Sequence, residues 1–170
     1  FDDAFWGHIG YTINNAGRAL VMGMTGSHFV SVPDGIAPEV RRYYQQLTRF
    51  SAAFAFIADI SMGTMGGALK RKEKLSARLG DILSLMYLAT ATLKRYESEG
   101  RHAADAPLMH WAIWDCMFRI QQAFEGVIAN FPNKLFALVL RHLVVFPLGR
   151  PYVVPSDRLG HKVAALLIAP

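Results

Sequence analysis

A run of basic side chains between residues 70 and 78 is the part of the sequence whose residue types and spacing suggest a binding chemistry. Its five cations are Lys70, Arg71, Lys72, Lys74 and Arg78. If this segment is helical, Lys70, Lys74 and Arg78 recur every four residues and form one cationic stripe. Such a stripe is either a solvated helix face or a docking face for an anionic partner, and both interpretations stay open.

Few other residues have types and spacing that suggest catalysis or metal binding. No two of the six histidines have the HxxxH spacing that places two imidazoles on one helix face. Cys116 lies among apolar residues, so we expect an inert core thiol. We expect Asp115 and Arg119, four residues apart, to form a surface ion pair. Asp59 is expected to lie on a solvated strip, and this strip would also contain Arg41, Gln45 and Thr48.

The composition indicates one domain in a reducing compartment. A chain of 170 residues can bury a sizeable core, and a single cysteine excludes an internal disulfide. The net charge of +5 favours acidic partners. The most apolar run, residues 135–146, is interrupted by Arg141 and His142, so we expect no transmembrane segment. We expect a cytoplasmic protein.

The hydrophobic spacing is helical almost throughout. A first helix is expected over residues 2–22, with an apolar stripe of Phe5, Ile9, Ile13, Ala16 and Leu20. A second begins at Pro38 and ends near Gly66 and Gly67, because glycine weakens helices there. Its predicted buried face contains Val40, Tyr43, Leu47, Phe50, Phe54, Ile57 and Ser61.

Two further helices, over residues 72–97 and 106–130, carry matching heptad seams. The first seam consists of Leu75, Leu79, Ile82, Met86, Ala89, Leu93 and Tyr96, and the second of Met109, Ile113, Cys116, Ile120, Ala123 and Val127. Such seams predict an antiparallel hairpin. A short apolar helix should follow Pro132, and Ser156 should cap a last helix over 157–168. The predicted fold is all-α, a helical bundle with a long central antiparallel hairpin and shorter peripheral helices.

Three stretches together resemble a known family. They are GGALKRKEKLSARLGDILSLMYLATATLKRYESEGR, PLMHWAIWD followed by IANFPN, and VVFPLGRPYVVPSDRLGHKVA. In length and order they resemble the C-terminal extension of the large bacterial FadE-type (long-chain) acyl-CoA dehydrogenases, over nearly the whole chain and most strongly over residues 43–162. The resemblance implies an FAD enzyme of fatty acid β-oxidation that converts acyl-CoA to trans-2-enoyl-CoA with a glutamate base.

The family's V-E-G-x-N-x-L-T-R-like glutamate motif does not occur in this sequence. We expect it upstream of FDDAFWGHIGY in a longer polypeptide, with residues 1–24 joining the catalytic body and 38–170 forming the extension. Glu125, in Phe124-Glu125-Gly126, is not followed by Asn-x-Leu-Thr-Arg, so we expect an ordinary helix acid. We therefore expect no catalytic, FAD or metal residue in this chain, and no activity from it alone.

The resemblance also implies partners. These are the catalytic domain, a second subunit in a homodimer and an anionic membrane surface, which would place the protein peripherally on the inner membrane. Residues 135–146 are either a buried core helix or a segment inserted into the membrane interface. The alternative function is an independent basic helical module that binds nucleic acid or an acidic protein. Because the aromatic residues follow core spacing, no nucleic acid is expected.

Overall fold

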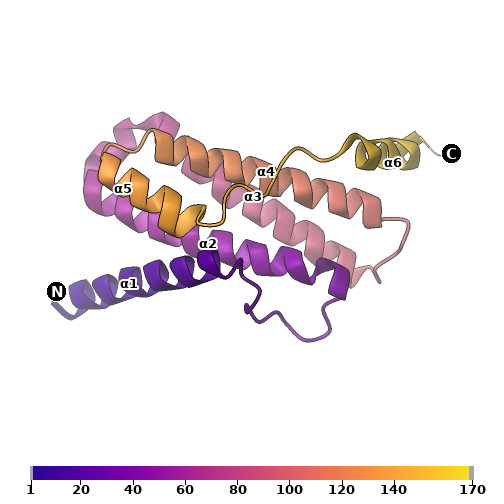
Figure 1. Cartoon of the computed structure of the whole chain (residues 1–170), viewed down its shortest axis with the longest axis horizontal. Helices are drawn as coiled ribbons and strands as arrows, with labels where there is room; N and C mark the ends of the chain where they lie inside the picture. Colours follow the sequence, from indigo (N-terminus) through magenta and orange to yellow (C-terminus); the bar gives the residue numbers. More distant parts are fainter. Residues whose placement is uncertain (1, 169–170) are drawn as a thin grey trace.

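The computed structural model describes residues 2–168, except for the side chains of residues 4, 5, 143 and 144, and confirms the predicted all-α class. The α-helices are α1 (Asp2–Met24), α2 (Pro38–Met65), α3 (Glu73–Ser98), α4 (Ala106–Ala129), α5 (Lys134–Val139) and α6 (Asp157–Ile168). A 3₁₀ helix η1 (Gly66–Arg71) joins α2 to α3, and a π-helix η2 (Leu140–Val145) continues α5. Helices pack on helices throughout the described residues (Figure 1).

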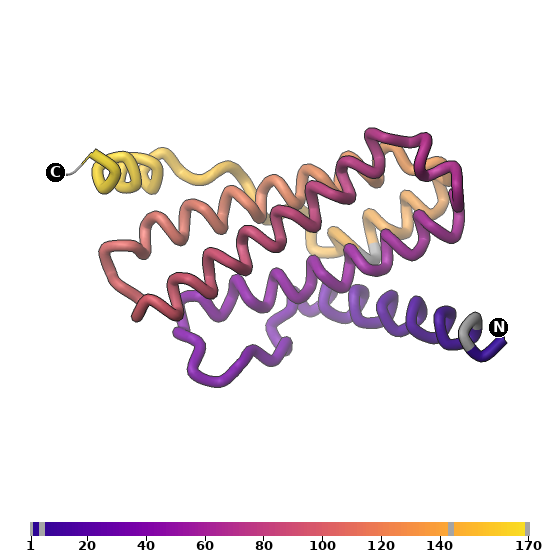
Figure 2. The backbone as a smooth tube through the Cα atoms, turned by 180° about the vertical axis from the view of Figure 1, so that it is seen from behind, coloured from indigo at the N-terminus to yellow at the C-terminus, as the bar shows by residue number. Residues whose placement is uncertain are grey.

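The α3–α4 hairpin forms the centre of the bundle, with the two helices side by side over their whole length (Figure 2). All seven predicted seam residues of α3 are buried. On α4 the prediction was partly wrong, because Cys116 and Ala123 are only half-buried while Met117 and Phe124 are fully buried. The physical reason is that α4 also packs against α2, where the Phe50 and Phe124 rings lie 5.7 Å apart.

The second helix begins at Pro38 as predicted, and it ends at Met65. Gly66 adopts a positive φ of 49°, a backbone conformation that glycine adopts without steric cost. The glycines therefore end the helix, as the sequence indicated. The predicted face of α2 is buried or half-buried along its length.

The predicted apolar stripe of α1 was partly wrong, because Ile9, Ala16 and Leu20 are half-buried but Ile13 is not. Ile13 is 67% exposed, whereas Asn15 and Ala19 are buried. The side chain of Phe5 lies outside the described residues. Small and polar side chains face α2, and the Thr12 hydroxyl donates to the Asp59 carboxylate at 3.3 Å.

The expected solvated strip on α2 was partly wrong. Arg41 is exposed, but Thr48 is half-buried, because α1 and the loop after it cover much of that side of the helix. Gln45 is buried, and its Nε2 donates to the carbonyl oxygens of His28 at 3.1 Å and Val30 at 3.2 Å. Asp59 is half-buried beneath α1. A polar residue on a helix need not face solvent when the main chain of a loop satisfies its side chain.

The segment after Pro132 is core on one face and surface on the other, so the buried-helix interpretation holds for one face and membrane insertion of the other stays a prediction. Asn133 caps α5, because its Oδ1 accepts from the backbone N–H groups of Leu135 at 2.9 Å and Phe136 at 3.2 Å. Ala137, Leu140, Val145 and Phe146 are buried. In contrast, Leu135 is 69% and Leu138 56% exposed.

The last helix, α6, lies against α4 at the end of the molecule farthest from the start of α1 (Figure 1). The Ser156 hydroxyl accepts from the Leu159 N–H at 3.4 Å, in agreement with the predicted cap. The preceding segment is fixed to α4 by two hydrogen bonds between Gln121 and the Tyr152 main chain, of 2.8 and 3.2 Å. The Trp114 indole N–H also donates to the Val153 carbonyl at 2.8 Å.

By length and composition alone, one continuous helical stretch within residues 2–168, Pro38–Arg71, could span a membrane. The expectation that no segment qualifies overlooked this stretch, because Asp59 divides its apolar run. Only 22% of its most apolar window is buried in the bundle. A single such helix is weak evidence, since a core helix can pass the same test, and we assign no membrane span.

Candidate functional site

The basic residues form a cluster at one end of the bundle and not a continuous stripe. Lys70 and Arg71 lie on η1, Lys72 joins η1 to α3, and Lys74 lies in the first turn of α3. Lys72 leaves the helical conformation, with φ −95° and ψ 60°, so the four-residue spacing does not continue across it. Gly66 and Gly67, at the start of η1, favour an interruption of the helix in this region, because glycine has low helix propensity. All four cations are exposed.

Arg78, the fifth predicted cation, is half-buried and lies across α4. A Cβ atom added at Gly126 would come within 2.7 Å of its Nε, so the missing side chain of Gly126 makes room for the guanidinium. Arg78 lines a polar groove of about 480 Å³ between α3 and α4, together with Asp81, Arg119 and others. The structure therefore separates Arg78 from the four exposed cations.

Within residues 2–168, Lys70, Arg71, Lys72 and Lys74 have no acidic partner. In the described part of the chain, the ion pairs are Arg95–Glu99 at 3.0 Å, Arg101–Glu97 at 2.6 Å, Arg119–Asp115 at 2.8 Å and Arg150–Glu125 at 3.1 Å. The third of these confirms the predicted pair on α4. None involves residues 70–78, so the positive charge there is available to an outside anion.

Exposed apolar side chains lie at the same end. Both views of the backbone place η1 and α5 together at the end of the bundle where α1 begins (Figures 1 and 2). Leu135 and Leu138 of α5 are exposed, and so is Met62 near the end of α2. Phe136 lines a groove of about 300 Å³ that also includes Gly63 of α2 and Ile9 of α1. We call the surface formed by Lys70, Arg71, Lys72, Lys74, Leu135 and Leu138 the basic end.

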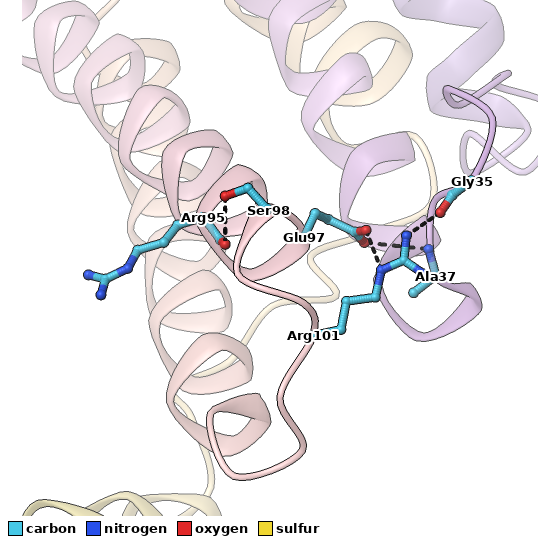
Figure 3. Close-up of polar contacts among 6 residues, drawn as sticks. All are labelled: Gly35, Ala37, Arg95, Glu97, Ser98 and Arg101. Atoms are coloured by element: carbon cyan, nitrogen blue, oxygen red, sulfur yellow. Dashed lines mark hydrogen bonds and ion pairs between the residues drawn. The ribbon is translucent and has the colours of Figure 1, made fainter.

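The opposite end of the hairpin is held by hydrogen bonds between its own groups (Figure 3). The Glu97 carboxylate accepts from Arg101 at 2.6 Å and from the Ala37 N–H at 3.4 Å. Arg101 also donates to the Gly35 carbonyl. These contacts join the end of α3 to the loop before α2. We call the region of Gly35, Ala37, Glu97 and Arg101 the bonded end.

The residues considered for catalysis are embedded in packing. Glu125 is half-buried and paired with Arg150. Burial, and to a lesser degree Asp115, raises the pKa of the half-buried Cys116 thiol, as expected of an inert thiol. Residues 2–168 contain no group of three or more His, Cys, Asp or Glu side chains placed to hold a metal ion.

Two polar features, one buried and one half-buried, were not found from the sequence. Arg49 is 4% exposed and donates to Gln46 at 3.2 Å and to the Val145 carbonyl at the end of η2. Burial lowers the pKa of Arg49. His110 and Tyr43 share a 2.9 Å hydrogen bond, and burial lowers the pKa of His110. The sequence held one sign of the buried Arg49, namely an arginine within a stretch predicted to be apolar. It held no sign of the Tyr43–His110 hydrogen bond, because these residues lie far apart in the sequence, on α2 and α4.

Comparison with known proteins gives one family. The family model described as acyl-CoA dehydrogenase, C-terminal, bacterial type matches residues 1–170. No solved structure matches this chain. The match spans the bundle and its peripheral helices, including both the basic end and the bonded end. The chain therefore belongs to the family of bacterial-type acyl-CoA dehydrogenase C-terminal domains.

Proposed function

We propose that this chain is the non-catalytic helical part of an FAD-dependent acyl-CoA dehydrogenase that converts acyl-CoA to trans-2-enoyl-CoA in β-oxidation. Its role is to dock on the catalytic domain or a second subunit and to hold the enzyme at an anionic membrane surface. The enzyme is then cytoplasmic and peripheral on the inner membrane. The family match supports the place of this domain in the enzyme.

The observation that carries the membrane role is the basic end, because η1 with its exposed cations and α5 with its exposed leucines lie at the same end of the bundle. An anionic bilayer attracts each Lys or Arg near its surface by about 1 kcal/mol. Four cations, opposed by Glu73, are therefore too weak to hold the protein alone. Burial of one leucine side chain contributes roughly 1.5–3 kcal/mol. Stable attachment commonly needs two such signals, and the basic end offers both.

The outward face of α1 supports the docking role. Ile13, Val21 and Met24 are exposed on this helix. A Cβ atom added at Gly10 or Gly17 would have no atom within 4 Å, so another helix has room to approach closely. We assign this face to the catalytic domain or the second subunit of a homodimer.

The described residues do not fit FAD, so we assign the flavin and the glutamate base to the catalytic domain. In Rossmann-type sites, dinucleotides place their pyrophosphate on a glycine-rich turn at a helix N-terminus. Of three cavities, the first is lined by residues inside α3 and α4, and the second by residues of α1, α2 and α5 whose one glycine, Gly63, lies within α2. The third reaches the start of α4, where the carboxylate of Asp105 opposes a pyrophosphate. Glu125 lines none of them.

Vesicle flotation tests the membrane role. Changing Lys70, Arg71, Lys72 and Lys74 to Glu should reduce binding to vesicles containing phosphatidylserine at least tenfold, because attraction becomes repulsion. Binding to pure phosphatidylcholine should stay weak for both proteins. The matched control changes four exposed cations elsewhere, Arg18, Arg41, Lys94 and Arg158, to Glu.

This control carries the same change in net charge and should keep most of the binding. Equal losses for the two variants would mean that net charge, and not the basic end, governs attachment. Unchanged binding of the first variant would reject the membrane role outright. Absorbance of bound flavin in the purified chain would contradict its assignment as the non-catalytic part.

A further inference from the structure

The side of α3 that faces away from its buried seam carries a second apolar stripe. Leu83, Tyr87 and Leu88 form this stripe, and Tyr87 is 73% exposed while each leucine is more than half exposed. Within the bundle α3 packs against α4, α2 and η1, and Figure 2 shows it between α2 and α4 with none of the other described helices in front of it. An exposed group of large apolar side chains on one helix face is typical of a protein–protein contact.

Small side chains lie on the same side of α3 and leave room for another helix. Gly80, Ser84 and Ala91 are exposed there. A Cβ atom added at Gly80 would have no atom within 4 Å. The distance between two packed helices depends on the side chains at their contact, so small residues permit a close approach. We call the surface formed by these three residues and the apolar stripe the outward face of α3.

The charged residues along one edge of this face have alternating signs. Asp81, Leu88 and Arg95 recur every seven residues, so they lie on the same side of α3. Lys74 precedes Asp81 by seven residues on this edge, and Glu99 follows Arg95 by one turn. From the start of α3 to its end, the charges are therefore positive, negative, positive and negative, with Leu88 in the middle. The pattern reverses its sign about Leu88.

A charge pattern that reverses about its centre is complementary to a second copy of itself in the antiparallel direction. With a twofold axis at Leu88, Asp81 of one copy faces Arg95 of the other, and this pair forms twice. Lys74 and Glu99 then lie three residues apart along the contact, about 4.5 Å. No two like charges of this edge face each other. An anionic membrane would instead favour one sign of charge, and a different protein would not require symmetry about one residue.

We propose that the outward face of α3 is a self-association surface, on which a second copy of this chain packs antiparallel with Leu88 at the twofold axis. The apolar residues supply most of the affinity, and the two Asp81–Arg95 pairs fix the orientation and the register. The inference rests on the proposed docking role, because it assigns the second subunit to α3. The outward face of α1 is then left for the catalytic domain.

Sedimentation equilibrium of the purified chain tests the surface. The fraction of dimer should rise with concentration, and Leu88→Glu should raise the dissociation constant about tenfold or more, because it places unpaired carboxylates at the twofold axis. Leu148→Glu, the same change at an exposed leucine outside α3, is the matched control and should leave the dissociation constant unchanged. A chain that stays monomeric at the highest soluble concentration, or equal dissociation constants for the two variants, would overturn the surface.

Exchange of the two charges tests the orientation. Asp81→Arg and Arg95→Asp should each weaken dimerisation, because each change places like charges opposite each other at two positions. A one-to-one mixture of these two variants should dimerise like the original chain, and so should a single chain that carries both changes, since opposite charges then face each other again. Failure of either to recover would overturn the antiparallel pairing about Leu88.

Vesicle binding separates this inference from the membrane role, because Asp81, Leu88 and Arg95 lie outside the basic end. A monomeric chain that still floats with phosphatidylserine vesicles would reject the self-association surface alone. A dimeric chain that does not float would support that surface and reject the membrane role alone.

Discussion

The two ends of the α3–α4 hairpin treat charged residues in opposite ways. At the bonded end, Glu97 and Arg101 use their charges on each other and on the main chain of the loop before α2. At the basic end, four cations point to solvent with no carboxylate within the 4.0 Å of an ion pair among residues 2–168. Paired charges hold a loop in place, whereas unpaired charges at an apolar surface leave their interaction energy for a partner.

Tyr152 lies in the segment that leads to α6, and it gives the largest expected effect on stability. Burial raises its pKa to about 12, so the folded chain disfavours its ionised form. The protonated form of Tyr152 therefore stabilises the folded chain. This contribution is fully present below pH 10, the ordinary pKa of tyrosine, and it is lost as the pH rises from about 10 to 12. We expect a loss of roughly 2–3 kcal/mol in the free energy of unfolding over this range.

Denaturant unfolding at several pH values measures this loss. The Tyr152→Phe variant keeps the two hydrogen bonds to Gln121, because these use main-chain atoms of residue 152. The variant should lose less stability in this interval than the original chain. Identical pH profiles for the two proteins would contradict the assignment to Tyr152.

Glu97→Ala should have the next largest effect, because it removes the acceptor shared by Ala37 and Arg101. The Glu97 side chain is only 12% exposed, so its loss leaves partly buried donors unsatisfied. We expect destabilisation of about 1–3 kcal/mol, measured by denaturant unfolding. Glu99→Ala is the control, since Glu99 makes an exposed pair with Arg95 that is worth well under about 1 kcal/mol. If Glu97→Ala and Glu99→Ala lowered the free energy of unfolding equally, the bonded end would be no different from an ordinary exposed surface.

The smallest effect on stability is expected at the basic end. The variant with Lys70, Arg71, Lys72 and Lys74 changed to Glu should unfold within about 0.5 kcal/mol of the original chain, because no internal partner is lost. Denaturant unfolding in moderate salt is the measurement. A cost like that of Glu97→Ala would show that these cations serve the fold, and it would weaken the case for an outside partner.

The sequence predicted the parts of the fold whose packing depends on one neighbour. The α3 seam was found completely, since seven residues at heptad spacing face a single antiparallel helix. The face of α1 was partly missed because Ile13 dominates its hydrophobic pattern, whereas the fully buried residues are Asn15 and Ala19. Small buried residues carry little hydrophobic signal, so the choice of face depends on the partner helix.

The candidate site was predicted in composition and not in arrangement. All five cations were identified from residue type, but the split between Arg78 and the others depends on Gly126, a residue on another helix. The break at Lys72 follows from the turn that η1 must make between two packed helices. The surface leucines of α5 could not be separated from its core residues, because the helix is apolar on both faces.

The hydrogen bond from Trp114 to the Val153 carbonyl fixes the chain to α4 shortly before α6 begins. Only Val154, Pro155 and Ser156 separate that anchor from the helix, a span of about 10 Å when extended. If α6 separates from α4, the short connection keeps it near α4 at an effective concentration in the millimolar range, so it binds α4 again. A free peptide of the same sequence should therefore compete poorly for the contacts that α6 makes with α4.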